Sequence, residues 1–147
     1  MARKKSEALR TYNELFRKEN EVYHQVADKL GLSDSAFEIL YAIYDAGPGC
    51  TQEDICIFMG IPKQTVNSSV RKMVQEGILR TEQAGKTVRL YFTDAGEALA
   101  NRCIVPVQEA EEAAFEQMNE HECAEFLRLQ HLYVQSLQTL LEKTFTK

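Results

Sequence analysis

Apolar side chains recur at helical spacing along most of the chain. Over residues 6–30 they lie three, four or seven positions apart, which predicts an amphipathic helix, and Gly31 predicts its end. A Ser-Asp-Ser stretch at 33–35 predicts the start of a second helix, and the Gly-Pro-Gly at 47–49 stops it. A last apolar stripe follows the helix cap expected at Asn119. The pattern therefore predicts a mainly α-helical chain.

A short helix, a tight break and a longer helix are predicted between Thr51 and Gly77. Thr51 is a good helix cap, and Asp54, three residues later, nearly matches the capping-box pattern. Gly60 breaks the short helix, and Pro62 suits the first turn of the next, where its missing N–H is not needed. This succession is the helix-turn-helix pattern.

The period of the pattern then changes from helical to strand-like. Residues 78–81 predict a strand, residues 83–86 a turn and residues 87–92 a second strand with alternating apolar and polar side chains. A hairpin directly after a helix-turn-helix predicts a winged helix. The buried face of the second strand is expected to consist of Val88, Leu90 and Phe92.

Thr93 is expected to cap a further helix over about 94–118, which Pro106 should kink. The segment from the helix-turn-helix to the hairpin is expected to have a small core of its own. Its members are Ile55, Phe58, Val66, Val70, Met73, Val88, Leu90 and Phe92.

The helix after Pro62 carries side chains suited to DNA. At about 100° per residue, its apolar residues share one face, and the opposite face offers amides, hydroxyls and a guanidinium, with no carboxylate before Glu76. Carboxylates would repel phosphates, whereas amides and guanidinium groups pair with purine edges in the major groove. We expect base contacts from Gln64, Asn67, Ser68 and Arg71. Phosphate or wing contacts are expected from Lys63, Thr65, Lys72, Lys86 and Arg89.

The order of these elements, with four motifs, resembles the MarR family of bacterial transcriptional regulators. The motifs are TQEDI at 51–55, KQTV at 63–66, EGIL at 76–79 and FTDAG at 92–96. The resemblance implies a homodimer whose first, fifth and sixth helices intertwine. It also implies two DNA-binding lobes on a palindromic operator, and an effector pocket where the lobe meets the dimer core.

On this resemblance the chain is one domain spanning residues 1–147. The winged helix-turn-helix lobe covers about 33–95, and the dimerisation helices cover about 6–30 and 94–145. The expected function is sequence-specific repression, relieved by a small aromatic effector. The effector pocket would be lined by six aromatic residues, for which plain core packing is the alternative: Tyr12, Phe16, Tyr23, Phe37, Tyr41 and Tyr44.

The predicted wing departs from the family pattern. Family members usually carry an Asp-x-Arg there, and its arginine enters the minor groove. The aligned residues are Ala84, Gly85 and Lys86. Because lysine lacks the planar fork of arginine, we expect weaker and less shape-selective contact from the wing.

Composition and charge set limits on the partners. The chain has 147 residues and a net charge of −5, which fits one domain or one subunit of a small oligomer. The acidic excess lies after residue 95, and only residues 51–95 are net positive. A local basic face is enough for DNA binding, although the near-neutral lobe leaves a protein-interaction module without specific DNA binding as an alternative.

The start of the chain gives no sign of export. Met1–Lys5 is basic and polar residues follow it, whereas a signal peptide needs an apolar stretch there. No apolar run approaches the roughly 20 residues that span a bilayer. We therefore expect a cytoplasmic protein that makes no membrane contact.

Enzyme chemistry is not indicated, because the chain shows no nucleophile motif, phosphate-binding glycine loop or metal-ligand spacing. We expect neither metal nor cofactor, and place His24, His121 and His131 at the surface or in packing. The four cysteines are expected to be free thiols: Cys50, Cys56, Cys103 and Cys123. Redox sensing remains an alternative, with Cys50, beside a loop, as its best candidate.

Overall fold

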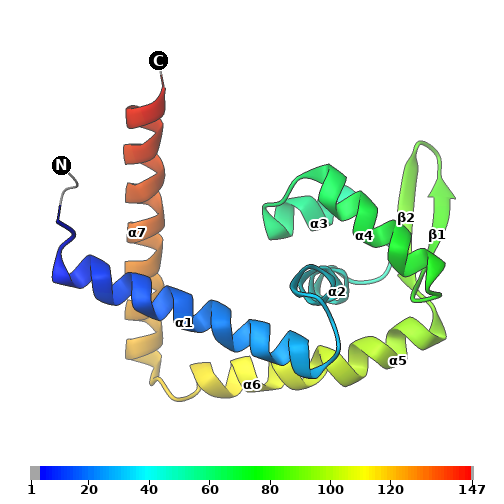
Figure 1. The fold of residues 1–147 in the computed structure, drawn as a ribbon, viewed down its shortest axis with the longest axis horizontal. Coiled ribbons are helices and arrows are strands. Elements are labelled where there is room, and N and C mark those ends of the chain that lie inside the picture. Colours follow the sequence, from blue (N-terminus) through cyan, green and yellow to red (C-terminus); the bar gives the residue numbers. More distant parts are fainter. Residues whose placement is uncertain (1–3, 147) are drawn as a thin grey trace. The chain divides into compact units, whose positions relative to one another are not determined.

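A computed structural model describes residues 4–146, which form seven helices and one β-hairpin (Figure 1). Residues 1–3 of the basic start lie outside the described residues. The elements are α1 (Glu7–Lys29), α2 (Asp34–Ala46), α3 (Gln52–Met59), α4 (Lys63–Gln75), β1 (Leu79–Ala84), β2 (Thr87–Phe92), α5 (Asp94–Cys103), α6 (Val105–Phe115) and α7 (Glu120–Phe145). The expected mainly helical fold with a hairpin wing is confirmed. Across residues 4–146, no helix is both long enough and apolar enough to cross a bilayer.

The chain divides into two compact units between Val105 and Pro106. The first holds α1 to α5 and the hairpin, and the second holds α7 and nearly all of α6. The assignment of the whole chain to one domain, with the lobe and dimerisation ranges given above, stays a prediction.

Polar side chains fix where several of the helices begin. Ser33, Thr51 and Thr93 each accept a hydrogen bond from the backbone N–H three residues on, which satisfies one of the free donors at a helix start. The capping box at Thr51 is complete, because the Thr51 N–H donates to Asp54 Oδ2 at 2.9 Å. Asn119 starts α7 in the same way. These short-range bonds explain why the predicted helix starts agree with the structure.

The core of the first unit lies where α2, α3, α4 and the hairpin meet. Ile55, Val66, Val70, Met73 and Leu90 are buried there, as predicted. The buried residues that the prediction did not include are more numerous, and the largest fully buried side chains among them on α2 and β1 are Ile39, Leu40, Ile43 and Leu79.

Two predicted core residues are not in this core. Phe58 is 52% exposed. Its side chain projects from the last turn of α3 and stacks on the ring of Tyr41, with ring centroids 6.4 Å apart. Val88 is 41% exposed, because it lies beyond Leu90 in the part of the hairpin that projects from the lobe. Phe92 is half-buried.

The helix predicted over 94–118 is two helices. α5 ends at Cys103 and α6 begins at Val105, so the interruption falls at Ile104 and is not a kink at Pro106. Pro106 has no N–H to bond the carbonyl four residues earlier, and its ring crowds that carbonyl. The chain therefore breaks just before the proline and restarts, and α6 ends at Phe115.

The turn of the hairpin is tighter than predicted. The register runs from Leu79 opposite Phe92 to Ala84 opposite Thr87, so only Gly85 and Lys86 lie outside the strands. Gly85 has φ 64°, which suits the first central position of a two-residue type II′ turn. The predicted four-residue turn was wrong, since residues 83 and 84 continue β1.

Candidate nucleic-acid interface

The helix α4 presents two different faces. Val66, Val70 and Met73 are buried and hold the helix against the lobe. The four residues predicted to contact bases are all exposed: Gln64, Asn67, Ser68 and Arg71. Lys63, Thr65 and Lys72 are exposed as well, so the structure brings the predicted α4 residues together on the solvent side of one helix.

Three of these side chains have contacts within the lobe. Asn67 Oδ1 accepts a hydrogen bond from Gln52 Nε2 at 3.4 Å, which links α4 to α3. The Ser68 hydroxyl donates to the Gln64 carbonyl at 3.1 Å, and Lys72 Nζ lies 3.9 Å from Glu76 Oε1. The Ser68 hydroxyl oxygen can still accept, and the exposed ion pair of Lys72 is weak, so both side chains can exchange these partners for DNA.

The wing carries cations on one face of the hairpin. Residues 81–89 are all exposed, and Lys86 lies at the turn. Arg89 lies opposite Glu82 across the strands, and its Nη1 donates to the carbonyl of Gly49 at 2.8 Å. Arg80 stacks over the Tyr91 ring, 4.5 Å from its centroid, and forms an ion pair with Glu82. Sequence reasoning missed Arg80, because its place on this face follows only once the register is known.

The six aromatic residues predicted to form a pocket divide into groups. Tyr12 and Phe16 stack within α1, with centroids 6.5 Å apart. Tyr23, Phe37 and Tyr41 form a row across α1 and α2, each ring 6.4 Å from the next, and Phe58 of α3 continues it. Phe37 is buried, whereas Phe16 is exposed. This arrangement suits packing between helices. Tyr44 is half-buried and takes part in none of these ring contacts among the described residues.

A cavity of about 390 Å³ lies elsewhere in the first unit. It is lined by the turn between α1 and α2, by α2, by the C-terminal part of α4 and by Leu99. The residues that line it include apolar Leu40 and Met73 and charged Lys72 and Glu76. None of the six aromatic residues contributes to this cavity.

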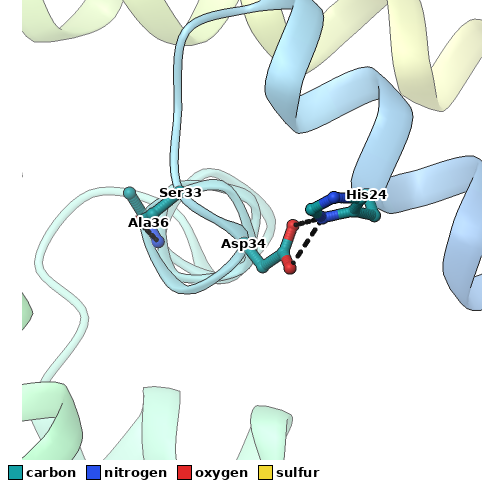
Figure 2. Close-up of polar contacts among 4 residues, drawn as sticks. All are labelled: His24, Ser33, Asp34 and Ala36. Atoms are coloured by element: carbon teal, nitrogen blue, oxygen red, sulfur yellow. Dashed lines mark hydrogen bonds and ion pairs between the residues drawn. The ribbon is translucent and has the colours of Figure 1, made fainter.

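A histidine joins α1 to the start of α2. His24 Nδ1 lies 2.9 Å from Asp34 Oδ1 and 3.0 Å from Oδ2, and Figure 2 shows the two side chains facing each other. Both side chains are well exposed. The hydrogen bond to Asp34 and its negative charge raise the pKa of His24 above its usual 6.5, with Asp28 and Glu21 adding to the effect. His24 therefore has a structural partner at the surface.

We predict that this contact makes stability depend on pH. Because the pKa of His24 is higher in the folded chain, its stabilisation is fully present below about 6.5 and is lost as the pH rises through the folded value. The difference in unfolding free energy between the wild type and His24→Gln should be larger near pH 6 than near pH 8, as measured by urea unfolding. The same comparison in an Asp34→Asn background is the control. If the effect of His24→Gln depends on pH to the same extent there, the contact with Asp34 is not its cause.

The cysteines show little sign of reactivity. All four are free, Cys50 and Cys103 are buried, and Cys56 and Cys123 are half-buried. Burial, with the nearby charge of Asp54, raises the pKa of the Cys50 thiol, which leaves less of the reactive thiolate. Redox sensing through Cys50 is therefore disfavoured. Within residues 4–146, no group of three or more His, Cys, Asp or Glu side chains could hold a metal ion.

A family model and several solved structures are similar to this chain. Residues 30–87 match the model of the MarR family. A MarR family regulator from Neisseria meningitidis has the same fold, with a TM-score of 0.80 and 17% identity over 95% of this chain and 99% of that chain. Staphylococcus aureus MepR, solved with DNA, matches with a TM-score of 0.71 and 16% identity over 86% of this chain and 94% of that chain.

A third solved structure concerns regulation of DNA binding by a small molecule. It is Bordetella bronchiseptica BpsR, described with 6-hydroxynicotinic acid, and it matches with a TM-score of 0.66 and 16% identity over 90% of this chain and 98% of that chain. At these identities the structures establish a shared fold. A search of curated proteins found no match.

Proposed function

We propose that this chain, a member of the MarR family of transcription regulators, binds a specific DNA operator through α4. The family consists of transcription regulators and not of enzymes. The observation that carries the proposal is the exposed, carboxylate-free side of α4, held in place by buried Val66, Val70 and Met73. In the major groove, Gln64 and Arg71 are suited to purine edges, and Lys63 and Lys72 to phosphates.

The proposal includes a homodimer on a palindromic operator. α7 has no buried residue, although its sequence is rich in large apolar side chains. Those exposed on it are Phe126, Leu127, Leu129, Leu132, Tyr133, Val134, Leu137, Leu140, Leu141 and Phe145. Monomeric proteins rarely expose so large an apolar surface. A two-fold partner would cover it and supply a second α4 for the other half-site.

Repression would follow if the bound dimer blocks polymerase, and binding to an operator would require the protein to be in the cytoplasm. A small aromatic effector would relieve repression by favouring a lobe spacing unlike that of the operator half-sites. The regulation of BpsR by 6-hydroxynicotinic acid supports an effector of this class. The first unit offers it two places, the aromatic residues of α1 and α2 or the cavity beside Lys72.

A second candidate function is docking of a protein. It is favoured by exposed apolar side chains on α3, where Ile57 and Phe58 face solvent. DNA binding is tested first, by selecting fragments from random DNA with the purified protein. Failure to enrich any sequence would favour the docking function.

We predict that α4 substitutions separate base contacts from phosphate contacts. Arg71→Ala and Gln64→Ala should each remove about 1–3 kcal/mol of discrimination between the selected operator and altered sites. Lys72→Ala should weaken all sequences alike and reduce the slope of log affinity against log salt by about 1.8, since each protomer of the dimer loses one phosphate contact. Both effects are measured by fluorescence anisotropy over a salt series. An equal loss on every sequence for all three variants would contradict these roles.

A further inference from the structure

The base of the wing is joined to the loop between α2 and α3. The Gly49 N–H donates to the Leu90 carbonyl at 2.9 Å, and the Leu90 N–H donates to the Cys50 carbonyl at 2.8 Å. Cys50 and Leu90 thus form an isolated antiparallel β-bridge, which pairs the loop with β2. Arg89 then donates from Nη1 to the Gly49 carbonyl at 2.8 Å, so both backbone groups of Gly49 are bonded to β2 residues.

The hairpin has little support beyond this point. Leu90 is fully buried, whereas residues 81–89 are all exposed. A two-stranded hairpin is marginal in water without a surface to pack on. Among the described residues, side-chain hydrogen bonds nearer the tip, such as that from Gln83 Nε2 to the Gly85 carbonyl at 2.9 Å, stay within the hairpin. The contact of Arg89 is therefore the outermost tie between wing and lobe.

The neighbours of Arg89 leave its guanidinium directed to the loop. Glu82 lies opposite Arg89 in the register but forms its ion pair with Arg80. Arg80 in turn stacks on Tyr91, its own cross-strand partner. The loop approaches the same ring, since a Cβ on Gly49 would lie 3.2 Å from the Tyr91 hydroxyl oxygen. Arg89 therefore bonds to a loop whose position is already fixed by backbone pairing.

Lys86 lies in the turn just before β2, three residues from Arg89, which corresponds to about 10 Å of extended chain. A small rotation at the base of the hairpin moves the tip by a larger amount. The direction of Lys86 therefore depends on how firmly the base is held.

We infer that Arg89 is a positioning residue, which ties the wing to the Gly49 carbonyl and so sets where Lys86 meets DNA, and that it does not bind a phosphate itself. The inference rests on the proposed function. The charge of Arg89 and its place on the wing alone predict contact with DNA, whereas the inference gives it a structural role within the lobe.

The first experiment measures the tie without DNA, by amide hydrogen exchange of the full chain. Arg89→Ala should speed exchange in residues 81–89 about five- to tenfold, because the hairpin loses a charge-assisted hydrogen bond to the lobe. Arg80→Ala is the charge-matched control, since it removes a cation from the same wing face and leaves the bond to Gly49. Unchanged exchange in Arg89→Ala, or an equal increase in both variants, would overturn the inference.

The second experiment is a double-mutant cycle on the selected operator. Lys86→Ala and Arg89→Ala should each weaken binding about three- to tenfold, and the double variant should lose no more than either single variant. The salt slope should fall by about 1.8 in both singles and in the double, since each protomer of the dimer loses the same one phosphate contact. If Arg89 binds a phosphate, the losses multiply and the slope of the double falls by about 3.6.

The two experiments separate the inference from the function on which it rests. A wild-type chain that binds no DNA would overturn the proposed function, and the exchange experiment would still decide whether Arg89 holds the wing. Faster exchange in Arg89→Ala, together with multiplicative DNA losses, would assign Arg89 both a tie and a phosphate contact and so refute a purely positioning role.

Discussion

Gly96→Ala is expected to destabilise the folded chain by about 3 kcal/mol, although alanine normally favours a helix over glycine by about 1 kcal/mol. Gly96 lies in the first turn of α5. A Cβ built there lies only 1.9 Å from the Ile78 carbonyl oxygen and 2.9 Å from its carbon. Those are backbone atoms, so relief of the contact requires α5 to move away from the segment before β1.

That movement would disturb several bonds at once. The Ile78 carbonyl accepts from the Thr93 N–H at 3.0 Å, and the Thr93 hydroxyl donates to the neighbouring Gly77 carbonyl, with the Ile78 carbonyl 3.2 Å away. The same hydroxyl oxygen accepts from the Gly96 N–H at 3.0 Å and caps the helix. Close packing therefore requires a glycine at position 96 of the FTDAG motif. Backbone conformation does not require it, because Gly96 is buried in a helix and its φ is not positive.

The measurement is thermal unfolding at a fixed protein concentration, where we expect a decrease in Tm of about 6–12 °C. Gly31→Ala is the control. Gly31 has a φ of +72° but nothing within 4 Å of an added Cβ, so it reports backbone strain alone, about 1 kcal/mol. Equal losses in the two variants would show that the contact with Ile78 relaxes without cost.

The sequence predicted those features that depend on neighbours within a few residues. The start of α3 follows from Thr51 and Asp54, which bond to each other three residues apart. The exposed face of α4 follows from the helical period, since burial of Val66, Val70 and Met73 fixes which side chains point outward. Most of the candidate DNA-binding set was accessible to sequence reasoning for this reason.

The wing was less predictable, because its register depends on where the turn begins. A four-residue turn at 83–86 would place Arg80 opposite Arg89, with two like charges facing each other. The two-residue turn shifts the pairing, so that Arg89 lies opposite Glu82 and Arg80 opposite Tyr91. The acceptor of Arg89, the Gly49 carbonyl, is 40 residues away in the sequence, and no local pattern indicates it.

The break before Pro106 shows a similar limit. A proline in a helical pattern is compatible with a kink or with a break and restart, and both leave the same carbonyl without its usual bond. Ile104, where the chain interrupts the helix, is fully buried. The choice therefore involves packing around Ile104, which the spacing of apolar residues does not specify.

Leu137→Glu is expected to abolish the proposed dimer and, with it, tight binding to a full palindromic operator. Leu137 is 41% exposed on α7 and lies within the apolar stripe that includes Phe126 and Tyr133. In a dimer interface a leucine side chain contributes about 1.5–3 kcal/mol, and a carboxylate there must be desolvated without a partner. Each dimer receives two such substitutions, so the association constant should fall about a thousandfold or more.

The mass by analytical ultracentrifugation should change from dimer to monomer, with a lower Tm and binding only at half-site affinity. Gln135→Glu is the matched control, because it adds the same carboxylate to α7 about half a turn away, off the stripe, and is exposed. It should remain dimeric and bind the palindrome as the wild type does. If the wild-type chain is a stable monomer at micromolar concentration and still binds the full palindrome tightly, the apolar surface of α7 is not the dimer interface, and the proposed architecture is wrong.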